Sequence, residues 1–321
     1  GTLLAQANGF VSANIHSPVS GTVAKIENVT DSNGYTKAAV IIDVEGDEWE
    51  ESIDRSEKLV KGCPLTAKEI VDIIGEKGIV GLGGATFPSK VKLCPPPGNK
   101  AEILIINAVE CEPYLTNDHA LMLAKPEQIV EGVAILMKAI NVSKAVIGIE
   151  NNKPDAIATL SRVASGYLGI EVQPLKVRYP QGGEKQLIDA IIRRQVASGA
   201  LPISTGAVVQ NVATAYAVYE AVQKNKPLVE RVMTVTGKSL KNPGNFLVRL
   251  GTPVANLIEA AGGLPEDSGK VILGGPMMGR AAVSLSSPVG KGTSGVLIIP
   301  ESEATRKKEE PCIRCAKCVS A

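Results

Sequence analysis

The chain has 321 residues, a length that predicts two or more domains, and its 44% hydrophobic content is enough to form buried cores. Its net charge of +1 gives no electrostatic argument for binding nucleic acid or an anionic membrane, and 3% aromatic residues argue against stacking platforms for single-stranded nucleic acid. No apolar run approaches the roughly 18 residues of a membrane-spanning helix.

The six cysteines are not distributed like a secreted disulfide framework. Cys63, Cys94 and Cys111 are scattered, and the other three lie together near the end of the chain. This pattern favours a reducing cytoplasm. The first residues contain no basic segment of the signal-peptide kind, and we expect the chain to be cut from a longer protein.

Residues 1–56 are predicted to form a small all-β module. We expect a first strand over residues 10–15. A turn that begins at His16 leads into a second strand, and after a further turn over residues 31–34 a third strand covers residues 38–44. The run Pro18-Val19-Ser20-Gly21-Thr22-Val23 resembles the opening of biotinyl- and lipoyl-type barrel-sandwich domains, although no hairpin lysine for a prosthetic group is evident. We expect His16 to have a structural role.

A glycine-rich loop follows a helix predicted over residues 66–76. Gly78, Gly81, Gly83 and Gly84 fall within seven residues, and Lys90 and Lys92 come soon after. Bare backbone N–H groups and nearby lysines suit an anion such as a phosphate, while the alternative is an ordinary surface loop. Thr86 breaks the strict G-x-G-x-x-G fingerprint, and no Walker A lysine follows, so the spacing alone predicts only an anion-binding loop.

Strands and helices then alternate. We expect strands over residues 101–107, 144–150 and 170–177, and helices over residues 126–140, 154–164, 184–195 and 212–222. This alternation predicts a mostly parallel, helix-covered sheet that binds ligands at the carboxyl ends of its strands.

Polar residues follow the first of these strands. Asn107, Glu110, Glu112 and Asp118 lie within twelve residues, where carboxylates and an amide could accept hydrogen bonds from a flavin, a ribose or a nicotinamide. The alternative is a polar loop whose acids cap a helix. Further on, short strands over residues 232–236, 246–249 and 271–273 and a helix over residues 253–261 predict a small α+β module of β-grasp proportions.

Two motifs together carry a family resemblance. Gly81-Leu82-Gly83-Gly84-Ala85-Thr86-Phe87-Pro88, followed by Asn107-Ala108-x-Glu110-x-Glu112-Pro113, resembles the NADH-binding flavoprotein subunit of respiratory complex I. The motif sequences resemble the C subunit of Rnf-type ferredoxin:NAD oxidoreductases more closely still, and this resemblance covers essentially the whole chain. Further matching segments are Tyr179-Pro180-Gln181-Gly182-Gly183-Glu184, Val209-Gln210-Asn211-Val212-Ala213-Thr214 and Gly274-Gly275-Pro276-Met277-Met278-Gly279.

The resemblance implies an α/β multidomain protein with four parts. These are a barrel-sandwich hybrid at residues 1–56, a Rossmann-like FMN- and NAD-binding domain at 57–226, a soluble-ligand-binding β-grasp domain at 227–300, and a linker with a truncated ferredoxin-like motif at 301–321.

The resemblance also implies which residues bind the cofactors. The loop glycines and a lysine would hold the FMN phosphate, two asparagines the flavin and its ribityl chain, Phe87 would lie by the nicotinamide cleft, and Glu112 and Glu184 would bond the dinucleotide. The full implied set is Gly81, Gly83, Gly84, Phe87, Lys92, Asn107, Glu110, Glu112, Asp118, Glu184 and Asn211. The sequence departs from the complex I pattern at three positions where flavin contacts would be expected, Val109, Gln210 and Ala213.

The implied activity is that of an NADH:acceptor oxidoreductase in which the flavin, rather than a catalytic side chain, carries the reaction. The chain would be a peripheral subunit on the cytoplasmic face of a bacterial membrane. It would work with the other subunits of an Rnf complex and, indirectly, with ferredoxin. Two alternatives are a soluble relative such as the cobalamin reductase of propanediol-using microcompartments, and a non-catalytic scaffold that retains the fold.

Near the end of the chain, Cys312, Cys315 and Cys318 have the C-x2-C-x2-C spacing that begins a bacterial-type [4Fe–4S] run. The chain stops one residue short of the expected fourth cysteine, so we expect it to be truncated within the iron–sulfur domain and its tail to carry no metal. Cys63, Cys94 and Cys111 lack ligand spacing and are expected to be ordinary thiols.

Overall fold

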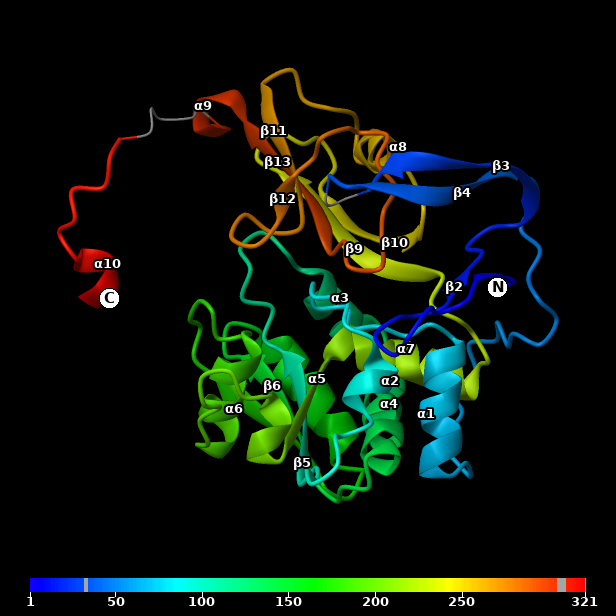
Figure 1. Cartoon of the computed structure of the whole chain (residues 1–321), viewed down its shortest axis with the longest axis vertical. Coiled ribbons are helices and arrows are strands. Elements are labelled where there is room, and N and C mark those ends of the chain that lie inside the picture. The colour runs from blue at the N-terminus through cyan, green and yellow to red at the C-terminus, as the bar shows by residue number, and fades with distance from the viewer. Residues whose placement is uncertain (32–33, 305–309, 321) are drawn as a thin grey trace.

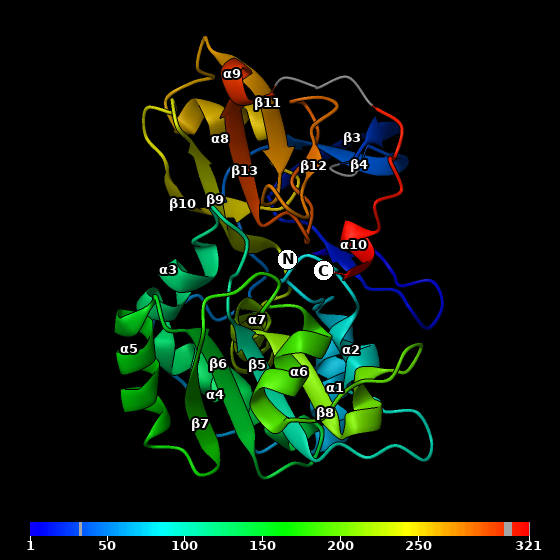
Figure 2. The same cartoon turned by 90° about the vertical axis from the view of Figure 1, so that its left-hand side faces the viewer.

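The computed structural model describes residues 1–31, 34–304 and 310–320. Its strands form two larger sheets and two short ribbons. Figures 1 and 2 show the parallel sheet with its helices below and the five-stranded sheet above, with the N-terminal ribbons to one side. Within the described ranges, no helix combines the length and apolar composition needed to cross a bilayer.

The lower module is built on a four-stranded parallel sheet, as predicted. Its strand order is β7 (Ile170–Leu175), β6 (Ala145–Glu150), β5 (Ile103–Ala108) and β8 (Ala207–Asn211). The central strands β5 and β6 are almost wholly buried, which explains their continuous apolar runs. Strand β8, which pairs with β5, was not predicted.

Helices cover both faces of this sheet. Helices α1, α4 and α7 pack together over one face, and Leu187 and Ile188 of α6 pack against the other. Gly132 lets α4 approach α7 closely, because a Cβ there would lie 2.0 Å from the Ala215 carbonyl oxygen. The helices are α1 (Ala67–Glu76), α2 (Ser89–Lys92), α3 (Asn117–Ala124), α4 (Pro126–Ala139), α5 (Pro154–Ala164), α6 (Glu184–Ile192) and α7 (Val212–Gln223), with a 3-10 turn at Pro202–Thr205.

The upper module is a five-stranded mixed sheet packed against α8 (Val254–Ala260). Only β9 and β13 pair in parallel. The predicted strands and helix are confirmed, but the central strand β13 was missed, although its apolar run is as continuous as that of β5. The strand order is β10 (Gly244–Arg249), β9 (Glu230–Gly237), β13 (Gly295–Pro300), β11 (Ser268–Leu273) and β12 (Arg280–Ala281).

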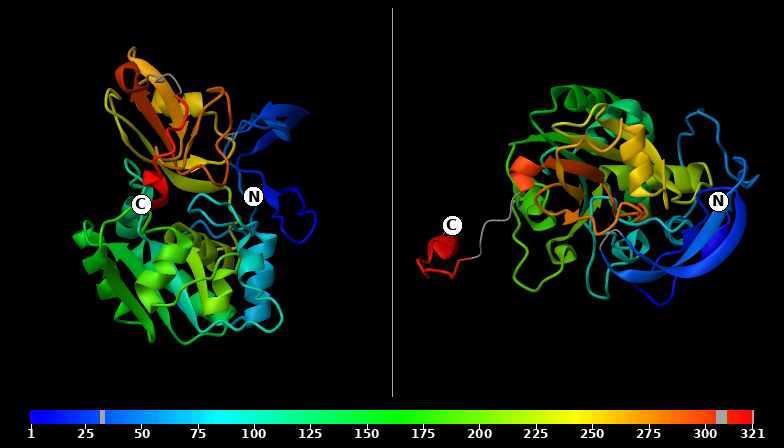
Figure 3. Two further views of the ribbon diagram at one scale, coloured as in Figure 1. Left: turned by 60° about the vertical axis from the view of Figure 1, so that its left-hand side comes forward. Right: turned by 90° about the horizontal axis from the view of Figure 1, so that it is seen from above.

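The N-terminal segment consists of two antiparallel ribbons, β1 (Leu3–Ala5) with β2 (Ile15–His16), and β3 (Gly21–Thr30) with β4 (Thr36–Val44). Figure 3 shows the longer ribbon beside the five-stranded sheet. The strand predicted over residues 10–15 is wrong, because side chains close a loop there: Asn14 Oδ1 accepts the Ala7 N–H and Ser12 Oγ the Asn8 N–H. The turn predicted over residues 31–34 lies partly outside the described residues.

The chain ends in two short helices, α9 (Glu301–Ala304) and α10 (Lys317–Ser320). Residues 305–309 of the linker expected at the start of segment 301–321 lie outside the described residues.

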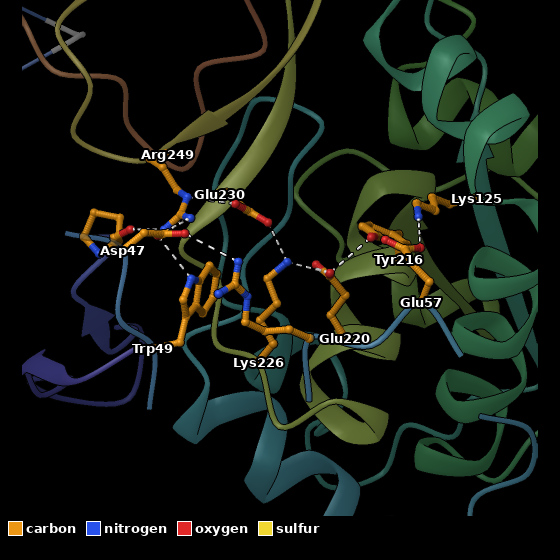
Figure 4. A network of polar contacts seen from close by, with 11 residues as sticks. Asp47, Trp49, Glu57, Lys125, Tyr216, Glu220, Lys226, Glu230 and Arg249 are labelled. Atoms are coloured by element: carbon orange, nitrogen blue, oxygen red, sulfur yellow. Dashed lines mark hydrogen bonds and ion pairs between the residues drawn. The ribbon is translucent and has the colours of Figure 1, made fainter. Parts of the chain in front are cut away.

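A network of charged groups joins the three modules at one place (Figure 4). The Trp49 ring lies between the guanidinium groups of Arg55 and Arg249, at 4.8 and 4.5 Å from its centroid. Arg249 also forms ion pairs with Glu230 of its own sheet and with Asp47 of the N-terminal segment.

Lys226 continues this network from the end of α7 into the five-stranded sheet. Its ammonium nitrogen lies 2.6 Å from a carboxylate oxygen of Glu220 on α7 and 2.6 Å from one of Glu230 on β9, and all three side chains are mostly buried. One cation therefore neutralises acids from two modules.

We expect Lys226→Met to lower the free energy of unfolding by about 3 kcal/mol, because it leaves the mostly buried Glu220 without its cation and leaves Glu230 with Arg249 alone. The control is Lys68→Met, since Lys68 is 88% exposed in an i,i+4 pair with Asp72 and its loss should lower stability far less. Urea unfolding followed by circular dichroism measures both. Equal losses in the two variants would contradict the role given to Lys226.

Candidate functional site

A cavity of about 1260 Å³ lies where the three modules meet. Its walls come from the glycine loop, the residues that follow β5, the start of α7, the N-terminal ribbons and three loops of the upper module. Because Asn107 and Asn211 are at the carboxyl ends of β5 and β8, the cavity is at the edge of the parallel sheet where such folds bind ligands.

The glycine loop presents bare backbone to this cavity. Gly84 has φ +113°, a conformation open to glycine, and a Cβ added there would meet nothing within 4 Å. The loop is anchored at both ends, because Gly81 N–H donates to the Phe87 carbonyl (2.9 Å) and Leu82 N–H donates to Thr214 Oγ1 (2.9 Å). Gly83 and Gly84 line the cavity between these anchors, which suits close approach of a phosphate group.

Lys92 is paired with another residue of the predicted set. Its ammonium nitrogen lies 2.6 Å from Glu184 Oε1 and 2.9 Å from the Val209 carbonyl oxygen. Neither Lys92 nor Glu184 is among the described residues that line the cavity, and neither is Phe87, whose side chain is 37% exposed. The structure thus brings Lys92 and Glu184 together beside the sheet edge.

Glu110 and Asp118 form a buried acid pair at the cavity wall. Glu110 accepts the N–H groups of Asp118 (2.7 Å) and His119 (3.1 Å) at the first turn of α3. The pKa of Glu110 is raised to about 8, mainly by burial and in addition by the charge of the neighbouring Asp118. Burial also raises the pKa of Asp118. The pair therefore holds a proton near neutral pH.

Both predicted asparagines line the cavity and are fixed by the protein. Asn211 Oδ1 caps α7 by accepting the Ala213 N–H (2.9 Å), which turns its Nδ2 toward Asp118 Oδ2 (2.7 Å). Asn107 Nδ2 donates to the Gly182 carbonyl oxygen (2.8 Å), so the loop before α6 is tied to the end of β5.

Glu112 connects two modules. Its carboxylate accepts the N–H groups of Met277 (3.1 Å) and Met278 (2.7 Å) in the loop between β11 and β12. Glu112 and Met278 both line the cavity.

Two mostly buried cations that hold loops of the cavity wall were not predicted, and of these only Lys291 lines the cavity itself. Arg231 of β9 donates to the carbonyl oxygens of Leu82 and Lys291, and the Lys291 ammonium donates to those of Asn14 and Gly78 at 2.7 Å each. Burial lowers the pKa of Lys291 to about 8. The only sequence feature that marks Lys291 is its place between Gly290 and Gly292, in a segment whose partners come from distant parts of the chain.

His16 is buried, and burial together with the cations Lys291 and Lys77 lowers its pKa to about 4. It is therefore neutral at the cavity wall, and its structural role stays a prediction.

The cysteine motif stays a prediction. Cys312 and Cys315 are exposed free thiols, and the Cys318 side chain lies outside what the structure describes. Among the described residues, no group of three or more histidine, cysteine or acidic side chains is arranged to hold a metal. Cys94 is an exposed free thiol, and Cys63 and Cys111 are half-buried ones.

Comparison with known families assigns each module. The Nuo51 FMN-binding domain model matches residues 74–220, the SLBB domain model matches 232–281, and the RnfC barrel sandwich hybrid domain model matches 1–47. The chain is 45% identical to the C subunit of the proton-translocating ferredoxin:NAD(+) oxidoreductase complex of Clostridium ljungdahlii, over 100% of this chain and 70% of the relative. The chain belongs to the RnfC family.

Other relatives agree. The C subunit of the Na(+)-translocating ferredoxin:NAD(+) oxidoreductase complex of Acetobacterium woodii is 42% identical over 99% of this chain and 72% of its own length. The C subunit of the ion-translocating oxidoreductase complex of Rhodobacter capsulatus is 39% identical over 99% of this chain and 62% of its own length. An NAD+-reducing [NiFe]-hydrogenase structure in the H2-reduced state matches 72% of this chain and 46% of its own chain with a TM-score of 0.62 at 24% identity, which shows a shared fold.

The acid pair predicts a pH dependence of stability. Because the pKa of Glu110 is raised in the folded chain, the folded state keeps a proton that the unfolded state loses, so stability falls as pH rises from about 4.5 to about 8. We expect Glu110→Gln to flatten this fall and to raise the melting temperature at pH 8 by a few degrees relative to wild type. Thermal melts between pH 5 and 8.5 measure the effect.

The matched control for that experiment is Glu259→Gln, an exposed glutamate of α8, which should leave the slope with pH unchanged. A wild-type slope that survives in Glu110→Gln would show that the proton is held elsewhere.

Proposed function

We propose that this chain is the flavin- and nicotinamide-binding electron-transfer subunit of an Rnf-type, ion-translocating ferredoxin:NAD oxidoreductase complex. The observation that carries the proposal is the bare glycine loop at the carboxyl edge of a parallel sheet, inside the segment that matches an FMN-binding family. The names of the relatives, which are similar along this whole chain, supply the reaction and the complex.

FMN fits the residues at this cavity. Gly83 and Gly84 would hold its phosphate through backbone N–H groups, because a Cβ at Gly84 would meet nothing within 4 Å, and Gly81, whose N–H is bonded to Phe87, would anchor the cradle. The amides of Asn107 and Asn211 line the same cavity and would bond the flavin and its ribityl chain. When bound, FMN supplies the conversion between hydride transfer and single-electron transfer.

The side chains then have supporting roles. Lys92 would contribute positive charge near the phosphate, balanced by Glu184. Glu110 and Asp118 would hold a proton at the cavity wall, which residues of the N-terminal ribbons and the five-stranded sheet also line. Phe87, Glu112 and Glu184 are proposed for the dinucleotide, and both glutamates must exchange their present partners to bind it.

Electrons would continue to iron–sulfur clusters. Cys312, Cys315 and Cys318 are proposed as three thiolate ligands of a [4Fe–4S] cluster whose remaining ligand comes from outside this sequence. The partners would be the other subunits of the complex and, through them, ferredoxin. We place the chain at the cytoplasmic face of the membrane as a peripheral subunit, with no role in binding nucleic acid.

The direct test is a visible absorbance titration. We expect the chain to bind added FMN, and NADH added without oxygen to bleach the flavin band, because the nicotinamide passes a hydride to the flavin. Binding without bleaching would contradict the dinucleotide part of the proposal. A chain that takes up no FMN at micromolar concentration would contradict the cofactor site itself and favour a non-catalytic scaffold.

A second test concerns the cradle. We expect Gly84→Ala to weaken FMN binding about tenfold or more, because the new methyl group enters the space proposed for the phosphate and positive φ strains alanine. Gly98→Ala is the matched control, since Gly98 also has positive φ and open surroundings but lies outside the cavity lining. Fluorescence quenching of FMN gives both affinities, and equal weakening would refute the assignment.

A further inference from the structure

The loop of residues 274–279 in the five-stranded sheet is held by a single acid of the parallel-sheet module. The Glu112 oxygens Oε2 and Oε1 accept the backbone N–H groups of Met277 (3.1 Å) and Met278 (2.7 Å). Hydrogen bonds from N–H groups to a carboxylate are stronger than those between neutral groups. Glu112 thus forms a clasp across the boundary between two modules.

The loop is shaped for this contact. Gly275 packs so closely on the carboxylate that an added Cβ would lie 2.2 Å from Glu112 Oε2. Gly279 closes the turn by donating to the Gly275 carbonyl oxygen (2.8 Å), and Gly274 has φ +101°. The Gly274-Gly275-Pro276-Met277-Met278-Gly279 run therefore has a geometric reason for its glycines: they let two consecutive N–H groups reach one carboxylate.

Burial separates the clasp from two other contacts between these modules. Arg231 reaches the Leu82 carbonyl oxygen from a buried position, and the Thr116 N–H donates to the buried Thr234 hydroxyl (3.0 Å). By contrast, Met277 is 54% and Met278 77% exposed. Water can replace Glu112 on their N–H groups, so the clasp can open while the buried contacts stay intact.

The clasp also uses the Glu112 carboxylate, which is the group proposed to bind the dinucleotide. Glu112, Gly275 and Met278 all line the cavity, and the close packing of Gly275 leaves no room for a further donor beside Oε2. Ribose hydroxyls are donors that a carboxylate can accept in place of N–H groups. A ligand that takes Glu112 Oε2 as its acceptor must therefore displace the loop.

We propose that Glu112 is a positioning residue that clasps the loop of residues 274–279 in the ligand-free chain, and that a nicotinamide dinucleotide releases the loop by taking Glu112 as acceptor for a ribose. The second half rests on the proposed function, and the first half does not. The clasp would thus couple arrival of the dinucleotide to opening of one wall of the cavity.

Hydrogen–deuterium exchange of the full chain, read by mass spectrometry on peptides that cover residues 274–279, tests the clasp without ligand. We expect Glu112→Ala to speed exchange at Met277 and Met278 about tenfold, since both N–H groups lose their acceptor. The exchange rate in Glu112→Gln should lie between those of wild type and Glu112→Ala, because the glutamine amide oxygen still accepts a hydrogen bond. The control Glu266→Ala, an exposed residue of the same module, should match wild type, as should β5 peptides in every variant.

The second arm adds ADP-ribose, a redox-inactive fragment of the dinucleotide, to the FMN-loaded chain. In wild type, exchange at Met277 and Met278 should rise toward the value of Glu112→Ala, while Glu112→Ala itself should not change. Slower or unaltered exchange with bound ADP-ribose would overturn the exchange of partners. An unaltered rate in ligand-free Glu112→Ala would overturn the clasp.

Calorimetry on the same samples separates the two levels of the proposal. If wild type binds neither ADP-ribose nor NADH, the proposed function fails and the ligand exchange fails with it. The ligand-free comparison still decides whether Glu112 holds the loop.

Discussion

The cavity depends on two buried cations whose partners are backbone carbonyl oxygens. Arg231 holds the carbonyl of Leu82, and Lys291 holds that of Gly78, so the upper module fixes the glycine loop at its first residue and again just before Gly83. A buried cation is tolerated only when hydrogen bonds replace its lost hydration, so these contacts set the loop position firmly. Burial lowers the pKa of Arg231 to about 10, which leaves it charged at neutral pH.

Arg231 also acts on an acid of the cavity wall. The charge on Arg231 favours ionised Asp118, while burial of Asp118 disfavours it. Asp118 in turn receives the Asn211 amide, whose other end is committed to capping α7. The Asn211 side chain therefore has one orientation, and its position at the cavity is set by the helix cap and the acid together.

The sequence predicted the parallel sheet well because β5 and β6 are buried on both faces and read as unbroken apolar runs. It missed β8, whose five residues are too short to show a period and end at Asn211, which was interpreted only as part of a motif. The same limit explains Lys92 and Glu184: a motif names both residues, but only folding brings α2 beside α6 so that they pair. Lys291 could not be found, since its partners lie 213 and 277 residues away.

Burial divides the polar contacts between the modules into two kinds. The Lys226 pairs with Glu220 and Glu230 are mostly enclosed, and breaking an enclosed pair leaves charges that water cannot reach, so these contacts hold the five-stranded sheet on the parallel-sheet module. The Glu112 contact lies at the surface, where water competes for the same N–H groups at little cost. The mobile part of the cavity wall is therefore a six-residue loop, while the rest of the upper module stays fixed over the site.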